Sequence, residues 1–303
     1  MKYFGISLGL FALSLSSAMA CDVCGMTNSA YMGALPLQTR SLVGVRGVYA
    51  RAHIFADGQK MATDALLQTE LWGRYVISPR WQATASLPMG HLQHTENDTT
   101  LRISGLADAS AMVMFRALAT DDSVRVAFRQ SLVLGAGGRV PTGKTFSPEY
   151  LSSHNLPPNF QLRLGGVSAQ AYLRYACAWR KWSFAADANA LFPMGSRNQY
   201  FFGNRYSSSA TLYFRHEQNE TKVMPFAGVL AEYFDKDIIL NDLKQWGYQP
   251  NSGGHGVQAF GGIEAYSGRL GGNITAYLPI YQAYAAGNVQ YVGRVSASLM
   301  VLL

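Results

Sequence analysis

The sequence has few charged residues and few cysteines, and beyond Ala20 it has no long hydrophobic run. Only 14% of its 303 residues are charged, which is low for a protein whose surface meets water. The formal net charge is +7, but the Lys and Arg residues form no basic run, so a nucleic-acid partner is not expected. No stretch after Ala20 reaches the roughly 18 apolar residues that a spanning helix needs. We therefore expect no transmembrane helix in the mature chain.

The first twenty residues have the pattern of a secretion signal. Lys2 precedes an apolar run over residues 4–15, and Ala18 and Ala20 provide the small-residue site that precedes cleavage. We predict three parts: a signal peptide over residues 1–20, a cysteine-containing periplasmic segment or plug over residues 21–40, and a barrel domain over residues 41–303.

Polar and apolar residues alternate with a period of two along most of residues 41–303. In the segment 167–179, Val167, Leu173 and Trp179 fall on one face, and Gln170 and Arg174 fall on the other. This alternation predicts β-strands that each have one apolar face. Twelve segments fit the pattern: residues 44–56, 65–77, 81–93, 105–118, 123–136, 166–179, 182–193, 205–217, 221–235, 257–266, 269–281 and 289–303.

The connections between these segments alternate between tight and long. The tight ones are expected at residues 78–80, 119–122, 180–181, 218–220 and 267–268, and the longest at 137–165 and 236–256. Short turns on one side and long loops on the other are typical of an outer-membrane barrel whose turns lie in the periplasm. A soluble β-sandwich would carry Lys and Glu on its polar faces, whereas these strands carry mainly Arg, Ser, Thr, Gln and Tyr.

The fold class predicted is therefore all-β: a single antiparallel transmembrane β-barrel of about twelve strands in the bacterial outer membrane, with both termini periplasmic. Aromatic residues near the expected tight turns fit the girdle that such a barrel places at the membrane interface. These residues are Tyr75, Trp81, Phe115, Trp179, Trp182, Phe214 and Tyr291.

Charged residues on the polar strand faces are expected to line the lumen. They are Glu70, Arg74, Asp108, Arg116, Arg125, Arg129, Arg174, Asp187, Arg215, Glu232, Glu264 and Arg294. Two interpretations stay open, because a twelve-stranded barrel is intermediate between filled small barrels and open porins. The charges form either cross-strand ion pairs that fill and stiffen the barrel, or a pore lining that favours anions or polar solutes.

Cys21 and Cys24 follow directly after the expected cleavage site. Four alternatives remain for this pair: a lipid attachment point, a disulfide in the oxidising periplasm, a soft-metal site, or no specific role. In a soft-metal site, the thiolates of Cys21 and Cys24 and the thioether of Met26 would favour Cu(I). No other cofactor is expected. Cys177 falls among the lipid-facing residues, so we expect a free thiol there.

Other motifs have ordinary explanations. Residues 138–145 match the phosphate-loop string G-x-x-x-x-G-K-T, but no helix is expected after them, so a nucleotide partner is not expected. His53, His91 and His94 could meet near the outer rim as a metal site, although solvated histidines are the commoner case. An outer-membrane lipase needs Ser and His side by side on the lipid-facing surface. No His is expected at such a mid-strand position, so we predict that the protein is not an enzyme.

Three landmarks resemble transporter-type outer-membrane barrels grouped with the phenol-degradation-pathway family. They are Ser104–Ser110, Leu134–Lys144 and Asn159–Gly166, and the likeness covers most of residues 40–303. The family usually has Gly at the position of Ala107. The motif Cys21-Asp-Val-Cys24-Gly resembles a subgroup with an N-terminal CDxCG sequence, in which a third Cys commonly stands where this chain has Met26. The resemblance implies a transporter-type barrel.

These observations favour a channel or transporter that works with outer-membrane lipid around it and a small-molecule or ionic solute inside it. A link to copper or another soft metal is the hypothesis attached to the Cys pair. The alternative is a closed-lumen structural or binding barrel that acts through its external loops, residues 137–165 and 236–256.

Overall fold

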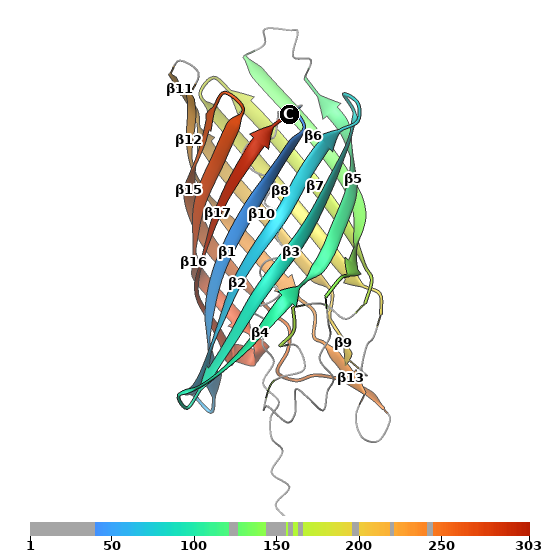
Figure 1. Ribbon diagram of the computed structural model, residues 1–303, viewed down its shortest axis with the longest axis vertical. Coiled ribbons are helices and arrows are strands. Elements are labelled where there is room, and N and C mark those ends of the chain that lie inside the picture. Colours follow the sequence, from blue (N-terminus) through green and yellow to red (C-terminus); the bar gives the residue numbers. More distant parts are fainter. Residues whose placement is uncertain are drawn as a thin grey trace, which may run out of the picture.

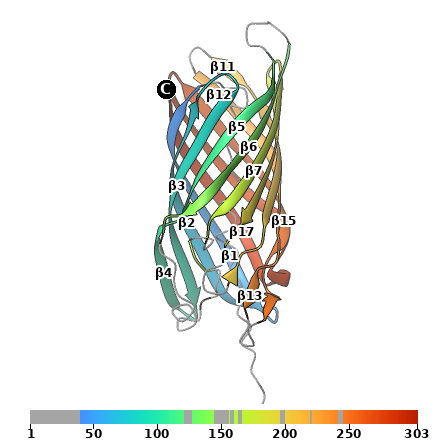
Figure 2. The ribbon, with the colours of Figure 1, turned by 90° about the vertical axis from the view of Figure 1, so that its right-hand side faces the viewer.

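The computed structural model describes residues 40–120, 127–143, 156, 160–162, 166–195, 200–218, 221–240 and 245–303. These residues form a closed antiparallel barrel of twelve strands (Figure 1, Figure 2), and this confirms the predicted all-β barrel. The barrel strands are β1 (Leu42–Ala56), β2 (Gln59–Val76), β3 (Trp81–Glu96), β5 (Asp108–Ala119), β6 (Phe128–Pro141), β7 (Ser168–Trp179), β8 (Trp182–Pro193), β10 (Arg205–Phe214), β12 (Thr221–Phe234), β15 (Gly254–Ser267), β16 (Leu270–Tyr284) and β17 (Val289–Leu302).

The barrel closes between its first and last strands. β1 and β17 pair from Leu42 opposite Leu302 to Ile54 opposite Val289. Each of the twelve strands therefore has two hydrogen-bonded neighbours. Such closure leaves no open sheet edge, and a sheet surrounded by lipid needs this because hydrocarbon offers its N–H and C=O groups no partner. Within the described residues no helix is long and apolar enough to cross a membrane.

The two ends of the barrel differ in their connections. At one end, called the short-turn end here, β2 joins β3 through residues 77–80, β7 joins β8 through 180–181, and β15 joins β16 through 268–269. The beginning of β1 and the end of β17 also lie at this end, where the Leu303 amide donates to the Ser41 carbonyl at 2.9 Å. At the opposite end, called the long-loop end, the connections from β6 to β7, from β8 to β10 and from β12 to β15 are long.

Two connections at the long-loop end are tight, which the predicted alternation of loop lengths did not include. β1 turns into β2 at Asp57-Gly58, and β3 turns into β4 (Thr99–Leu106) at Asn97-Asp98. All four turn residues have positive φ, between 44° and 76°. Two-residue turns of this kind match the twist of the flanking strands and select Asp, Asn and Gly. The two hairpins therefore extend the barrel wall at this end, where Figure 2 places β4.

Short elements complete the fold. β4 pairs with β3 and leads into β5, and β11 (His216–Gln218) continues the line of β10. At the long-loop end, β9 (Tyr200–Phe201), β13 (Ile238–Leu240) and β14 (Trp246–Tyr248) form a small separate sheet. The 3-10 turn η2 (Ala285–Gly287) joins β16 to β17.

The outer face of the barrel is apolar, as the alternation predicted. Large hydrophobic side chains point outward from every part of the wall, among them Val45, Leu71, Val113, Leu173 and Ile263. At the short-turn end, outward aromatic rings pair across strands: Trp81 with Phe115 at 4.9 Å between centroids, and Trp182 with Phe214 at 5.0 Å. These pairs belong to the predicted girdle.

A second row of outward rings lies at the long-loop end of β8 to β16. Adjacent centroids are 5.5 to 6.5 Å apart along the row Phe192, Tyr206, Tyr233, His255 and Tyr281. Trp182 and Phe192 both point outward from β8, ten residues apart and in opposite rows. At about 3.3 Å per residue and a strand tilt of about 40°, the rows are about 25 Å apart along the barrel axis. This is the height of the apolar band of an outer-membrane barrel.

Tyr291 does not belong to the girdle, so its assignment from the sequence was wrong. The ring is 3% exposed and points inward at the long-loop end. The reason is a bulge in β17: Arg51 pairs with Gly293, but Ala52 pairs with Tyr291, which leaves Val292 as an extra residue. An extra residue reverses the in–out alternation beyond it.

Candidate functional site

The inner wall of the barrel carries most of the charged side chains that the sequence assigned to it. Seven of them are buried on inward-facing positions: Glu70, Arg74, Asp108, Arg174, Glu232, Glu264 and Arg294. Arg116, Arg129 and Asp187 are half-buried on the same faces. Arg215 lies at the short-turn end, where its exposed side chain donates to the Arg180 carbonyl at 2.8 Å and approaches Glu217 at 3.5 Å. Arg125 is outside the described residues.

Several of these charges are paired between neighbouring strands. Arg174 Nε lies 3.3 Å from Asp187 Oδ1, and these two residues are opposite each other in β7 and β8. Glu232 accepts a hydrogen bond from the Gln258 amide at 2.7 Å. Within β15, Glu264 accepts a hydrogen bond from the Tyr266 hydroxyl. Buried carboxylates and guanidinium groups of this kind are tolerated because each interaction offsets part of the desolvation cost.

Three inward arginines were missing from the sequence-based set. Arg46 pairs with Glu70 across β1 and β2, with Arg46 Nε 2.9 Å from Glu70 Oε2. Arg139 is an inward residue of β6, which continues to Pro141 although the predicted strand ended at residue 136. Arg205 is the first residue of β10, where alternation gives little guidance. For Arg46 the period-two pattern of residues 42–50 was a usable signal.

The missing arginines complete a belt of alternating charge on the inner wall. Arg139 interacts electrostatically with Asp108 and Glu70, and Glu232 interacts with both Arg294 and Arg205. The belt thus involves strands on all sides of the barrel. Arginine is in excess over carboxylate on the inner wall, which favours anions there.

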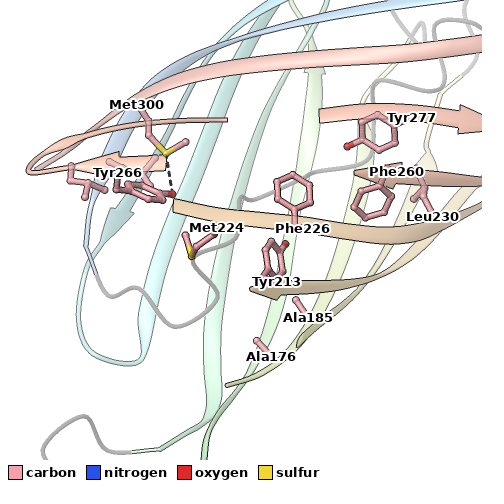
Figure 3. Close-up of a cluster of buried hydrophobic side chains, with 12 residues drawn as sticks. Ala176, Ala185, Tyr213, Met224, Phe226, Leu230, Phe260, Tyr266, Tyr277 and Met300 are labelled. Carbon is pink, nitrogen blue, oxygen red and sulfur yellow. Dashed lines mark hydrogen bonds between the residues drawn. The ribbon is translucent and has the colours of Figure 1, made fainter. Parts of the chain in front are cut away.

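An apolar cluster lies on the inner wall between the middle of the lumen and the short-turn end (Figure 3). Four of its rings form a continuous row across β10, β12, β15 and β16: Tyr213, Phe226, Phe260 and Tyr277. The guanidinium of Arg294 lies 3.9 Å from the centroid of the Tyr277 ring. In Figure 3 the Tyr266 hydroxyl also reaches Met300 Sδ, at 3.6 Å. The rings are almost fully buried, so solvent reaches little of this wall.

A second apolar cluster lies inside the long-loop end, and we call it the mouth cluster. It consists of Ala52, Leu66, Leu92, Ile103, Leu156, Phe160, Phe234, Tyr284, Ala285, Val289 and Tyr291, with Leu101 and Leu162 packed against it. Leu156, Phe160 and Leu162 come from the connection between β6 and β7. A Cβ added to Gly90 would lie 2.4 Å from Leu162, so the missing side chain of Gly90 makes room for that contact. These three residues therefore pack against the inner wall.

The loops on the other side of the long-loop end are held by the buried carboxylate of Asp237. It accepts hydrogen bonds from the Tyr200 hydroxyl and from the Gly203 amide, the latter at 2.7 Å. Its own amide donates to Ser252 Oγ at 2.9 Å. Burial raises the pKa of Asp237 above its usual value, although Arg205 and the two hydrogen bonds act in the opposite direction. Asp237 thus connects the loop before β10 with the loop before β15.

The three histidines suggested as a rim metal site do not come together. His94 points inward and its Nδ1 lies 2.6 Å from Asp64 Oδ1, whereas His91 points outward. Residues three apart in a strand face opposite sides, so one ion cannot bind both side chains. His53 is bonded to Thr63 at 3.2 Å. Among the described residues no group of three or more His, Cys, Asp or Glu could hold a metal ion.

His91 does form one contact that the sequence analysis did not expect. Its Nδ1 lies 2.8 Å from Ser104 Oγ on the neighbouring strand β4, and both side chains are exposed on the outer face. The sequence analysis expected no His at an outward mid-strand position, whereas His91 lies within β3 and points outward beside Ser104. Within the described part of the chain, Ser104 is the only hydrogen-bond partner of the His91 ring. A serine nucleophile needs a base that a third group orients, and residues 40–120 and the other described segments provide no such group for His91.

The remaining motifs lie in ordinary places or outside the described residues. Gly138–Pro141 belongs to strand β6, and Gly143 packs closely on the Leu106 carbonyl. Cys177 is a free thiol that points outward from β7. Cys21, Cys24 and Met26, together with the predicted signal peptide and periplasmic segment, are outside the described residues.

Comparisons with known proteins agree with this architecture. No protein-family model matches the chain, and no curated protein matches it. An outer membrane channel from Pseudomonas putida F1 has a similar structure, with a TM-score of 0.63 and 13% identity over 88% of this chain and 97% of that one. The beta domain of the Bordetella autotransporter Brka has a TM-score of 0.48 and 11% identity, over 87% of this chain and 100% of that one. The NanC porin has a TM-score of 0.41 and 12% identity, over 86% of this chain and 98% of that one.

The first of these likenesses shows a shared fold. Together with the apolar outer face and its two aromatic rows, it identifies a β-barrel of the bacterial outer membrane.

Proposed function

We propose that this barrel is a channel or transporter that moves a small polar or anionic solute across the outer membrane. The observation that carries the proposal is the belt of buried charge on the inner wall, in which Arg139, Arg205 and Arg294 alternate with Asp108 and Glu232. A barrel that needed only stability could fill its interior with apolar side chains, because buried ion pairs add little net stability. Charged residues inside a membrane protein commonly mark the path of a solute.

A matched pair of variants on β10 tests the proposal. Ser209 points into the lumen and its neighbour Ser208 points outward. We expect the wild-type barrel to give single-channel steps in a planar lipid bilayer. Ser209→Trp should reduce these steps strongly because the indole fills the lumen, whereas Ser208→Trp adds the same ring on the lipid side and should leave them unchanged. Silence of the correctly folded wild type, or equal effects of both variants, would contradict a channel.

The alternative of a closed-lumen binding or structural barrel has an observation in its favour. The apolar cluster of Figure 3 and the mouth cluster are both buried, so the inner wall has little contact with solvent at two levels. Such a barrel would act through its loops, whose small sheet of β9, β13 and β14 offers an ordered surface. Absence of conductance with normal folding would favour this function.

A link to copper is a separate proposal that rests on the sequence alone. Cys21, Cys24 and Met26 provide two thiolates and a thioether, the soft ligands that Cu(I) prefers. We also propose that the short-turn end faces the periplasm, which would leave residues 21–40 there as a plug or tether. The reduced full-length protein should bind Cu(I), and a Cys21→Ser, Cys24→Ser double variant should not. Equal binding of Cu(I) by the two proteins would rule out this site.

A further inference from the structure

Three arginines lie close together on the inner wall at the short-turn end: Arg74 on β2, Arg116 on β5 and Arg174 on β7. Arg116 and Arg174 are both opposite Val133, on either side of β6. The charges of Arg174 and Arg116 both act on Arg74. Three guanidinium groups within interaction range repel one another, so an anion between them would be attracted by all three.

Their hydrogen-bonding capacity is only partly used. Arg74 is 7% exposed, and its Nη2 donates to the Arg40 carbonyl at 3.3 Å. Arg74 Nε and Arg116 Nε are buried and have no hydrogen-bond partner within the described part of the chain. Arg174 has the carboxylate of Asp187 beside it. A buried charged donor without an acceptor is unfavourable, and an acceptor from outside the protein would remove that cost.

An aromatic row lies near these arginines on the inner wall. Tyr213 and Phe226 are 5.3 Å apart between centroids, and the row continues through Phe260 to Tyr277 (Figure 3). Tyr213 interacts electrostatically with Tyr172, which also interacts with Arg174 and Arg74. Tyr172 thus links the aromatic row to the arginines.

We propose that this part of the lumen binds a small organic carboxylate, with its charged group at Arg74 and Arg116 and its apolar body against Tyr213 and Phe226. The inference rests on the proposed transport function and names the substrate class. A bare inorganic anion would satisfy the arginines but gain nothing from the rings. A neutral apolar molecule would contact the rings but leave the guanidinium donors unsatisfied.

Binding can be measured separately from transport, on the folded full-length barrel in detergent by saturation-transfer NMR. Butanoate and acetate are the probes, because both carry a carboxylate and only butanoate has a substantial apolar body; butanol is the neutral counterpart. We expect butanoate to bind more tightly than acetate. Arg74→Gln and Arg116→Gln should each weaken butanoate binding by about tenfold, the usual size for a lost charge-assisted hydrogen bond.

Three further variants make the result specific. Arg215→Gln removes the same charge from an exposed position at the same end, and should leave binding unchanged. Phe226→Ala should weaken butanoate and leave acetate unaffected. Arg74→Lys keeps the charge and should bind butanoate more tightly than Arg74→Gln, which separates a contact with the ligand from a folding defect.

Each outcome counts for or against the site. Unchanged binding in folded Arg74→Gln and Arg116→Gln, or equal affinity for butanol and butanoate, would overturn it. Conductance without carboxylate binding would support the proposed channel and contradict the proposed carboxylate site. Carboxylate binding without conductance would support the proposed site and contradict the proposed channel.

Discussion

The ion pair between Arg46 and Glu70 can be used to measure whether water has access to the lumen. Arg46 Nε lies 2.9 Å from Glu70 Oε2, and Arg46 Nη2 contacts the same oxygen. The two side chains are 14% and 8% exposed. The guanidinium also lies 5.9 Å from the centroid of the Trp72 ring. Arg46→Leu would therefore leave the Glu70 carboxylate in a site that solvent hardly reaches.

The size of the effect follows from this burial. Two unit charges about 4 Å apart attract each other by about 4 kcal/mol at an effective dielectric constant of about 20. Removing one partner of a buried pair typically costs about 3–5 kcal/mol, because the other charge stays buried and unpaired. We expect Arg46→Leu to lower the free energy of unfolding by about 3 kcal/mol. The double variant Arg46→Leu, Glu70→Leu should come within about 1 kcal/mol of the wild type, since neither charge of the pair is left without the other and Arg139, which also interacts with Glu70, keeps Asp108.

Reversible urea unfolding of the barrel in lipid vesicles, followed by tryptophan fluorescence, measures these differences. Arg215→Leu is the matched control, because its ion pair with Glu217 is exposed and should contribute less than about 1 kcal/mol. If Arg46→Leu costs as little as Arg215→Leu, water solvates Glu70 inside the lumen. The argument from burial would then be refuted, and an open aqueous lumen would be the better description.

Three further predictions use other parts of the structure. Burial raises the pKa of Asp237, so the folded loops bind its proton more tightly than the unfolded chain does, and they should lose stability as pH rises from about 4 through the raised pKa. Hydrogen exchange at the loop amides should report this loss, and Asp237→Asn should remove it. Trp81→Ala breaks the ring pair with Phe115 and should destabilise the barrel by about 1 kcal/mol in urea unfolding, with Trp81→Phe much closer to the wild type. A fluorophosphonate probe should not label Ser104, because no third group among the described residues orients His91; labelling that disappears in His91→Ala would make the pair a catalytic site.

The barrel was predictable from the sequence where the strands cross the apolar band. The segment 182–193 was predicted with the bounds that β8 has, and the faces of residues 167–179 were assigned correctly in β7. In this band the outer face meets lipid and the inner face carries polar groups, so alternation is strong. The predicted fold and location depended on this pattern, and both were confirmed.

The bounds of the strands were predicted wrongly outside the apolar band. β2 begins at Gln59, six residues before the predicted start, and β4 was not predicted as an extended hairpin. Here the outer face meets water, so both faces carry polar residues such as Lys60, Thr63 and Asp64, and the alternation disappears. The turn sequences Asp57-Gly58 and Asn97-Asp98 were the remaining signal for these hairpins.

Alternation identifies which side chains face the lumen, but it does not identify their partners. Arg174 and Asp187 are opposite each other because of the register between β7 and β8, and that register depends on the turn at residues 180–181. The closeness of Arg74 to Arg116 and Arg174 depends on the curvature and closure of the whole barrel. The proposed carboxylate site could therefore be recognised only in the three-dimensional structure, although the sequence analysis had placed each of its charged residues in the lumen.

At the long-loop end of β16 and β17, alternation does not predict which residues face the lumen. In β17, Val292 and Gly293 both point outward, and in β16 the pairing skips Ile280 between Val257–Tyr281 and Gln258–Pro279. Each bulge reverses the expected faces toward the long-loop end. This reversal directs Tyr291 inward, where its ring meets that of Tyr284 at 4.8 Å in the mouth cluster. Because bulges at barrel rims re-aim side chains in this way, Tyr284 and Tyr291 enter the apolar layer at the long-loop end through two local irregularities that the period-two pattern of the strands does not predict.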